Sequence, residues 1–248
     1  YDKEIQQFNE GLPEGAIVST AESREQARRE RVRRRPRLSP HAFHLKRQDR
    51  VVFLGDGLLE REQWYGYLET RLAVRYARHQ LRFRNLSWSG DTPTGRSRAS
   101  FDWHQEESSW FERIEKPFVA FEPTVVILGY GMSSSFDGLE GVEKFRRDLN
   151  RLIDRLIESV PDQGLRFVLM GPTVHEDLGG DFPDPDDHNL ALAAYSKAVE
   201  TIAEERKYPF INLYDWLGDG LTAGISRAHT ENGIHLSRYG YSRLADVY

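Results

Sequence analysis

Short apolar runs that alternate with helical stripes constrain the fold of this chain more than any other feature. Four runs are rich in β-branched and large apolar residues and are bounded by Gly, Pro or Asp, at residues 51–54, 125–128, 167–170 and 210–213. Such runs are typical of strands that are buried on both faces of a parallel sheet. A fifth run, at residues 81–86, alternates apolar and charged residues, which predicts a strand at a sheet edge with one solvated face.

Helical periodicity fills the segments between these runs. Apolar residues recur every three or four positions in three stretches: Trp64, Leu68 and Leu72; Val142, Phe145, Leu149, Leu152, Ile153 and Leu156; and Leu192, Tyr195, Val199 and Ile202. The order of strands and helices predicts an α/β fold, a three-layer α/β/α sandwich around a mainly parallel sheet of about five strands. Residues 46–248 contain no repeat and no low-complexity linker, so we expect them to form one domain.

The first 45 residues differ in composition from the rest of the chain. Residues 24–37 hold only two acids, Glu25 and Glu30, beside eight arginines, which are Arg24, Arg28, Arg29, Arg31, Arg33, Arg34, Arg35 and Arg37. The run predicts an Arg-rich extension or arm over residues 1–45. We expect a solvated helix that packs on its own domain or contacts a protein partner through arginines such as Arg24, Arg28, Arg31 and Arg35. Binding to nucleic acid or anionic lipid is the alternative. Nucleic acid is the weaker interpretation, because no aromatic residue interleaves the arginines and no nucleic-acid fold signature follows.

Composition excludes several classes of site. The chain has no cysteine, which excludes disulfide scaffolds, cysteine zinc sites, iron–sulfur clusters and cysteine nucleophiles. No apolar run approaches the roughly 18 residues that a membrane-spanning helix needs, so no membrane span is predicted. The spacing of His41, His44, His104, His188 and His229 does not pair two of them on one helix face. The sequence therefore predicts no metal and no cofactor.

Four motifs stand where strands end, which is the edge of a parallel sheet where ligands and catalytic groups gather. They are Gly55-Asp56-Gly57, Ser89-Gly90-Asp91-Thr92, Gly131-Met132-Ser133-Ser134 and, before the last predicted helix, Asn232-Gly233-Ile234-His235. Together they resemble the SGNH or GDSL hydrolase superfamily over roughly residues 46–248. The resemblance implies a flavodoxin-like fold and serine acyl transfer. In that mechanism Ser attacks an ester, His is the base, Asp orients the His, and Gly and Asn donors hold the oxyanion.

Three of the five functional positions depart from the pattern of that superfamily. Gly57 stands at the nucleophile position, Ser133 replaces the oxyanion Asn, and Asn232 replaces the Asp that orients the base. Gly90 and His235 are kept. The resemblance therefore implies a degenerate triad of His235 and Asn232, and an oxyanion or ligand site formed by Asp56, Gly57, Gly90 and Ser133. Since glycine has no side-chain nucleophile, a serine mechanism through position 57 is excluded.

The finer pattern resembles a particular branch of the superfamily. Phrases such as Gly66-Tyr67-Leu68-Glu69-Thr70, Trp88-Ser89-Gly90-Asp91 and His175-Glu176-Asp177-Leu178 are similar to SGNH-like domains of planctomycete-type proteins. In that branch the domain is often joined to a dehydrogenase-like propeller and a haem-binding module, and it frequently lacks the nucleophile. The resemblance implies that Gly57 is native, that the protein is exported, and that a binding or assembly role is favoured over catalysis.

Other interpretations of the same residues stay open. A laboratory Ser→Gly replacement could explain Gly57, but it would not explain Ser133 and Asn232 as well. Asp56 could act as a nucleophile or base, or could cap the first helix. Ser133 could be the nucleophile of an elbow of the α/β-hydrolase type, although Ser135 stands where that elbow has its second glycine.

Further polar and aromatic residues lie close to these motifs in the sequence. His175 and Glu176 could bind a cation or a sugar hydroxyl, or could stabilise a loop. Arg96 and Arg98 could face an anionic ligand or be solvated. A carbohydrate platform or the packing of a long loop would account for Trp88, Trp103 and Trp110.

Two functional hypotheses follow. The first is a catalytically inactive binding or structural subunit of a larger assembly. The second is a residual esterase on O-acylated carbohydrate, in which His235 activates water and Gly90 and Ser133 donate to the oxyanion.

Overall fold

A five-stranded parallel sheet forms the centre of the molecule. The computed structural model describes residues 43–102, 107–222 and 228–247. The strands lie in the order β2-β1-β3-β4-β5, with the bounds β1 Arg50–Gly55, β2 Arg82–Asn85, β3 Val125–Gly129, β4 Arg166–Met170 and β5 Phe210–Ile211. All five predicted strands and the edge position of β2 are confirmed. The last strand is shorter than predicted because a helix begins at Leu213.

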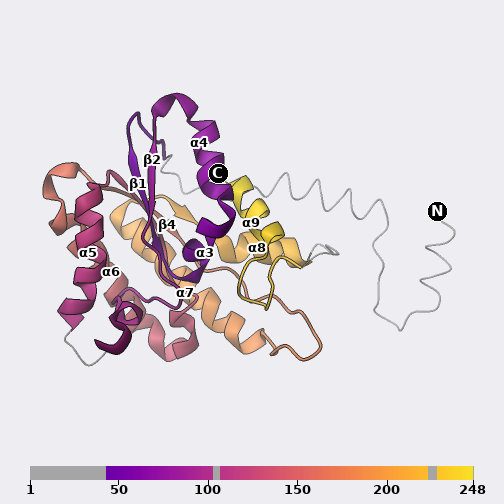
Figure 1. Cartoon of the computed structure of the whole chain (residues 1–248). Helices are drawn as coiled ribbons and strands as arrows, with labels where there is room; N and C mark the ends of the chain where they lie inside the picture. The colour runs from indigo at the N-terminus through magenta and orange to yellow at the C-terminus, as the bar shows by residue number, and fades with distance from the viewer. Residues whose placement is uncertain (1–42, 103–106, 223–227, 248) are drawn as a thin grey trace, which may run out of the picture.

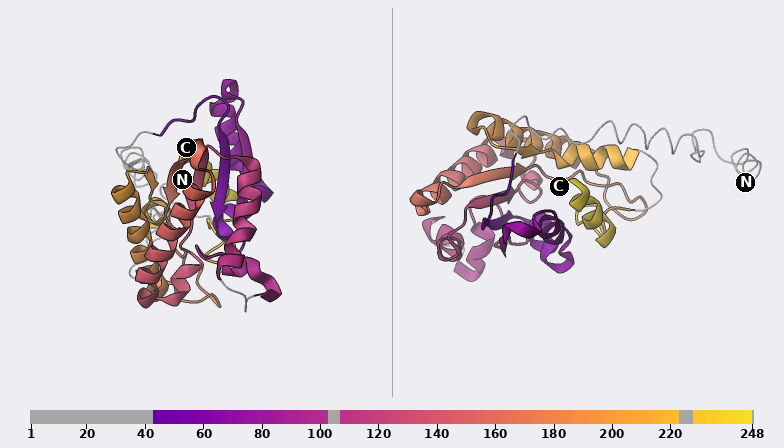
Figure 2. Two further views of the ribbon diagram at one scale, coloured as in Figure 1. Left: turned by 90° about the vertical axis from the view of Figure 1, so that its left-hand side faces the viewer. Right: turned by 90° about the horizontal axis from the view of Figure 1, so that it is seen from above.

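Helices cover both faces of the sheet (Figures 1 and 2). Their bounds are α3 Gly57–Tyr65, α4 Tyr67–Arg75, α5 Glu107–Phe121, α6 Val142–Ser159, α7 Asp186–Arg206, α8 Leu213–Thr222 and α9 Arg238–Leu244. Successive side chains of a strand point to opposite faces. Val52 and Leu54 accordingly pack with residues of α5, α6 and α7. Val51 and Phe53 pack with residues of α3, α4, α8 and α9. The predicted three-layer arrangement is therefore present.

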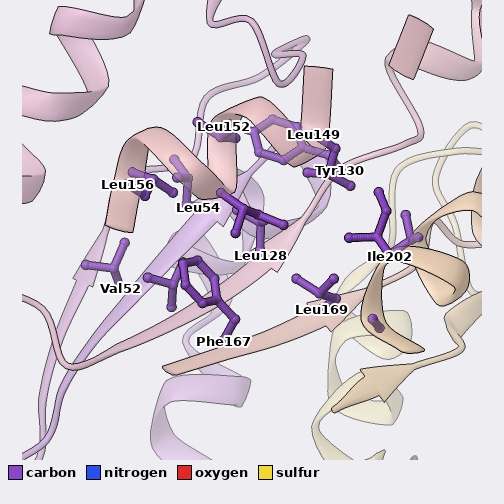
Figure 3. Close-up of a cluster of buried hydrophobic side chains, with 14 of the residues drawn as sticks. Val52, Leu54, Leu128, Tyr130, Leu149, Leu152, Leu156, Phe167, Leu169 and Ile202 are labelled. Carbon is purple, nitrogen blue, oxygen red and sulfur yellow. The ribbon is translucent and has the colours of Figure 1, made fainter. Parts of the chain in front are cut away.

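The predicted stripes of α6 and α7 are buried against the sheet. Figure 3 shows Leu149, Leu152 and Leu156 of α6 over Leu54 and Leu128 of the strands. Burial of a large aliphatic side chain contributes roughly 1.5–3 kcal/mol, so this cluster accounts for much of the stability of that face.

The stripe predicted from Trp64 to Leu72 is wrong in one respect. Gly66 adopts a left-handed conformation with φ 65°, which ends α3 and starts α4 in a new direction. Leu68 and Leu72 are buried as predicted, but Trp64 is 64% exposed. The Arg61 guanidinium lies 4.8 Å from the centre of its ring instead. A single helix would have buried Trp64, and the glycine was the sequence signal against it.

The strand order creates a switch point between β1 and β3. The chain leaves β1 toward β2 on one side, whereas β3, β4 and β5 extend the sheet on the other. In open parallel sheets the crevice outside such a point is the usual ligand site. Only glycine fits where the two strands end, because a Cβ on Gly55 would lie 2.0 Å from the carbonyl oxygen of Gly129. The segments that follow β1 and β3 thus begin side by side.

Several predictions concern residues that the structure does not describe. The Arg-rich arm over residues 1–45, with Arg24, Arg28, Arg31 and Arg35, falls almost entirely outside the described ranges, as do His41, Trp103 and His104. Within those ranges, no helix combines the length and apolarity needed to cross a bilayer.

Candidate functional site

A cavity of about 280 Å³ opens at the switch point of the sheet. Segments that follow β1, β2, β3 and β4 and the turn before α9 line it, with the residues Asp56, Gly57, Leu58, Gly90, Gly129, Tyr130, Met132, Ser133, Phe136, Gly171, Pro172, Thr173, Ile234 and His235. Five of the six predicted site residues therefore meet at one cavity. The sixth, Asn232, contacts His235 from outside it.

Gly57 faces the imidazole of His235. A Cβ built on Gly57 would lie 3.7 Å from His235 Nε2, and 3.7 Å from Ser89 Oγ. These are ordinary van der Waals distances, and the backbone of Gly57 does not have a positive φ. A serine would therefore fit at position 57 with its hydroxyl within reach of His235.

Asn232 holds His235 through two kinds of hydrogen bond. Its side-chain oxygen accepts from the backbone N–H groups of His235 (2.9 Å) and Ile234 (3.3 Å). This fixes the orientation of the amide, whose nitrogen lies 3.0 Å from His235 Nδ1. An amide nitrogen can only donate, so Nδ1 must accept and the ring proton of a neutral His235 resides on Nε2.

His235 is electrically neutral at pH 7. Partial burial lowers the pKa of its imidazole, and the positive charge of Arg61 lowers it further, against the opposing effect of Glu231 and Glu60. The cavity is thus presented with an Nε2–H donor rather than with a free nitrogen lone pair. An aspartate at position 232 would reverse this, because a carboxylate can only accept from Nδ1.

Asp56 is a structural carboxylate. It is 2% exposed, caps α3 by accepting from the N–H of Leu58 (3.3 Å), and accepts from the N–H of Ser133 (3.2 Å). Burial raises its pKa to about 6, although these backbone N–H groups and that of Gly131 oppose the shift. Since its oxygens bind the loops after β1 and β3 together, the helix-cap interpretation is confirmed.

Ser133 lines the cavity but does not occupy a nucleophile elbow. Its backbone is in the ordinary right-handed helical region, with φ −64° and ψ −37°. An elbow holds its serine in a sharp, strained turn between strand and helix. The elbow alternative is therefore wrong. Its backbone N–H is also committed to Asp56, which leaves only the hydroxyl to face a ligand.

A buried ion pair supports the loop that carries Gly90. Arg98 donates through Nε to Asp91 (2.8 Å) and through its terminal nitrogen to the carbonyl of Leu86 (2.8 Å), while the Tyr130 hydroxyl donates to the same carboxylate (3.1 Å). Arg98 neither faces a ligand nor is solvated, so both predicted roles for it are wrong. Arg96 is exposed.

Glu176 anchors the turn that carries His235. Its carboxylate accepts from the backbone N–H groups of His229 (3.0 Å) and Thr230 (2.7 Å) and from the Thr230 hydroxyl (2.6 Å). Burial alone would raise the pKa of Glu176, but these hydrogen bonds lower it overall. The loop-stabilising interpretation of Glu176 is confirmed.

His175 belongs to a second chain of polar contacts beside the cavity. Its Nδ1 lies 3.0 Å from Nδ1 of His188, whose Nε2 lies 2.7 Å from Oγ of Ser135. Burial lowers the pKa of both imidazoles. Among the residues with described positions, no three His, Cys, Asp or Glu side chains gather as a metal site would require.

Ser89 and Glu60 are the polar residues near the cavity that the sequence reasoning missed. The Ser89 hydroxyl donates to Glu60 Oε2 at 3.3 Å, and Ser89 Oγ lies next to the Gly57–His235 gap. The available signal was the place of Ser89 directly before Gly90. Trp88, also in this loop, is 49% exposed but is not among the residues that line the cavity, and Trp110 is partly buried.

A comparison with protein families gives a direct match. The model of the GDSL-like lipase/acylhydrolase family matches residues 53–243. The chain belongs to this family. A comparison with curated proteins found no match.

Solved structures of family members share the fold. A GDSL-like lipase from Parabacteroides merdae is 20% identical, with a TM-score of 0.66 over 82% of this chain and 95% of that one. An acetylxylan esterase from Geobacillus stearothermophilus is 18% identical, with a TM-score of 0.63 over 83% and 94%. A gut microbial diltiazem-metabolizing enzyme is 16% identical, with a TM-score of 0.61; 84% of this chain covers only 47% of that enzyme.

Proposed function

We propose that this GDSL-family chain binds an acylated carbohydrate in the switch-point cavity and does not cleave it by the serine chemistry of its family. The observation that carries the proposal is Gly57, whose missing side chain leaves an open gap in front of His235. Exposed Trp88, the neighbour of Ser89 in the chain, offers an aromatic face on which a sugar ring can stack.

The state of His235 supports binding over catalysis. A general base must present an unprotonated nitrogen to the group that it deprotonates. Asn232 donates to Nδ1, which leaves the proton on Nε2 and makes His235 a hydrogen-bond donor toward the cavity. A carbonyl oxygen of an ester or amide is the acceptor that such a donor suits.

The acetylxylan esterase offers a contrast. Its catalytic mutants replace a serine, an aspartate and a histidine, and the last two are three positions apart. Asn232 and His235 have the same spacing in this chain, while the counterparts of the serine and aspartate are Gly57 and Asn232. We infer that two of three catalytic groups were exchanged together, in agreement with the resemblance to the degenerate planctomycete-type branch. A binding subunit of an exported assembly, contacted through the arm of residues 1–45, fits this proposal.

Residual hydrolysis is the second candidate function. The observation in its favour is the neutral imidazole of His235 beside the cavity. For His235 to activate water, its proton would have to move to Nδ1. The Asn232 amide would then have to turn over and lose its hydrogen bonds to the backbone of Ile234 and His235.

Calorimetric titration tests the proposal. We expect an acetylated xylo-oligosaccharide to bind, the deacetylated oligosaccharide to bind more weakly, and neither to be hydrolysed during the titration. His235→Ala should weaken binding of the acetylated ligand about fivefold, because the loss of one hydrogen bond costs about 1 kcal/mol. Ser159→Ala, a Ser→Ala control at the end of α6, should not change binding. Equal affinity for both oligosaccharides, or turnover that His235→Ala abolishes, would contradict the proposal.

A further inference from the structure

The gap in front of Gly57 has a hydroxyl on one side and a hydrogen-bond donor on the other. The Cβ position of residue 57 is 3.7 Å from Ser89 Oγ and 3.7 Å from His235 Nε2. A reacting carbonyl needs a place about 3–3.5 Å from the attacking atom and within hydrogen-bond reach of an oxyanion donor. The space that a side chain at position 57 would fill is close to both requirements.

Ser89 also has a proton acceptor. Its hydroxyl donates to Oε2 of Glu60 at 3.3 Å, and Glu60 lies on the first turn of α3, the helix that begins at Gly57. A carboxylate in hydrogen-bond contact with a hydroxyl can accept its proton as the oxygen attacks. The side chain of Ser89 is exposed, so an incoming ester can reach it.

We propose that Ser89 is a relocated nucleophile, which takes an acyl group from a bound ester with Glu60 as base and His235 as oxyanion donor. Ser89 Oγ forms a bond to the carbonyl carbon while its proton passes to Glu60. The tetrahedral oxyanion accepts the Nε2–H of His235. Its collapse breaks the bond to the alcohol oxygen, which leaves with the proton from Glu60. The products are acyl-Ser89 and the free alcohol.

This scheme explains why Asn stands at position 232, where the family has Asp. A His235 that carries its proton on Nε2 cannot accept a proton there, but it can donate a hydrogen bond to an oxyanion. A carboxylate is a weak base for a serine hydroxyl, so acylation is expected to be slow and to need an activated ester. The chemistry goes beyond the proposed binding function, and its failure would leave the result of the titration unchanged.

Covalent labelling of the full chain tests the proposal. The protein is incubated with p-nitrophenyl acetate, and intact mass followed by peptide mapping locates any acetyl group. We expect one acetyl on Ser89 in the native chain and in Ser159→Ala. We expect none on this peptide in Ser89→Ala, and at least about tenfold slower labelling in Glu60→Gln and His235→Ala, as loss of a general base or oxyanion donor costs 10²-fold or more in efficient enzymes.

A further variant tests the contribution of the gap at Gly57 while leaving the Ser89 hydroxyl in place. Gly57→Ala places a methyl group in the space that the carbonyl would occupy, at ordinary contact distances, so the protein should fold and label much more slowly. An acetyl group on Ser133 or on lysines alone would overturn the proposal. Labelling of Ser89 at the same rate in Glu60→Gln, His235→Ala and Gly57→Ala would also overturn it, since it would show an exposed hydroxyl without a site.

Discussion

Asn232 determines what His235 can do. Both side chains are where the family has its base and orienting acid, and the hydrogen bond between them has the expected partners. The direction of that hydrogen bond is reversed, because an amide nitrogen donates where a carboxylate would accept. One exchanged atom therefore changes the proton position on the imidazole and removes the lone pair from the cavity.

Asn232→Asp should raise the pKa of His235. In the native chain burial and Arg61 hold this pKa below its ordinary value of 6.5. A carboxylate at position 232 would accept from Nδ1–H and attract the imidazolium, which raises the pKa of a neighbouring His. Nitrogen-15 NMR titration of the ring measures both the pKa and the proton position. Asn150→Asp on α6 adds the same charge elsewhere and should leave His235 unchanged. A native ring with its proton on Nδ1 would contradict this description.

Roles of single residues were the hardest to predict from the sequence. The strand-end motifs were enough to predict that Gly57, Gly90 and His235 meet, because the sheet brings its carboxyl ends together. Arg98 was not predictable, since its partners Asp91 and Tyr130 come from two different strand ends. Ser89 and Glu60 meet for the same reason, through a crossover that no local pattern encodes.

The junction of α3 and α4 contains a buried carboxyl group, Glu62, that makes stability depend on pH. Glu62 is 2% exposed and accepts from the N–H of Leu68, in the first turn of α4. Burial raises its pKa from 4.5 to about 7 despite that hydrogen bond. The favourable contribution of protonated Glu62 is thus fully present below pH 4.5 and is lost as pH rises through 7.

Glu62→Gln should flatten the dependence of stability on pH. Between pH 5 and pH 8 the native free energy of unfolding is expected to fall, and this variant should remove about 1–2 kcal/mol of the fall. Asp56, whose pKa is raised to about 6, accounts for part of the remainder. Urea unfolding at several pH values measures this dependence of the free energy of unfolding on pH. Glu143→Gln, at an exposed position of α6, is the control. An identical slope in native protein and Glu62→Gln would rule out this origin.

Each loop that forms the cavity has its own buried anchor. Asp56 joins the segments after β1 and β3, the Asp91–Arg98 pair supports the loop after β2, and Glu176 holds the turn before α9. Loops with so many satisfied backbone groups present their cavity residues in defined positions. The cavity therefore has a defined geometry on all of its sides, and the proposed binding function requires this.

At the scale of the whole molecule, the fold was predictable and the chemistry was only partly so. Strand and helix periodicity was sufficient for the sheet, its layers and the edge strand, because buried strands and amphipathic helices have distinct patterns. The break at Gly66 was missed although the glycine is a local signal for it, and the short β5 was missed because tertiary packing decides where such a strand ends. Which side chains meet in the site depends on the order of the strands. That order is a property of the whole sheet and cannot be read from any one segment of the sequence.

The most direct measurement is the hydrolysis of p-nitrophenyl acetate by Gly57→Ser combined with Asn232→Asp, beside the native chain and each single variant. We expect no turnover dependent on His235 in the native chain. The double variant should gain hydrolysis at least about 100-fold above it, which His235→Ala abolishes. Gly57→Ser alone should gain far less, because an Asn in place of the orienting Asp can cost about 10⁴-fold in kcat through the wrong tautomer.

A matched double variant controls for effects of the substitutions other than the added hydroxyl. Gly57→Ala combined with Asn232→Asp has the same backbone and charge changes without the hydroxyl, and it should remain inactive. Restored, His235-dependent turnover would establish that a serine at position 57 and an aspartate at position 232 are enough for catalysis in this site, even with Ser133 in place of the oxyanion Asn. Native turnover that is lost in His235→Ala, or a folded double variant that stays inert, would contradict the account.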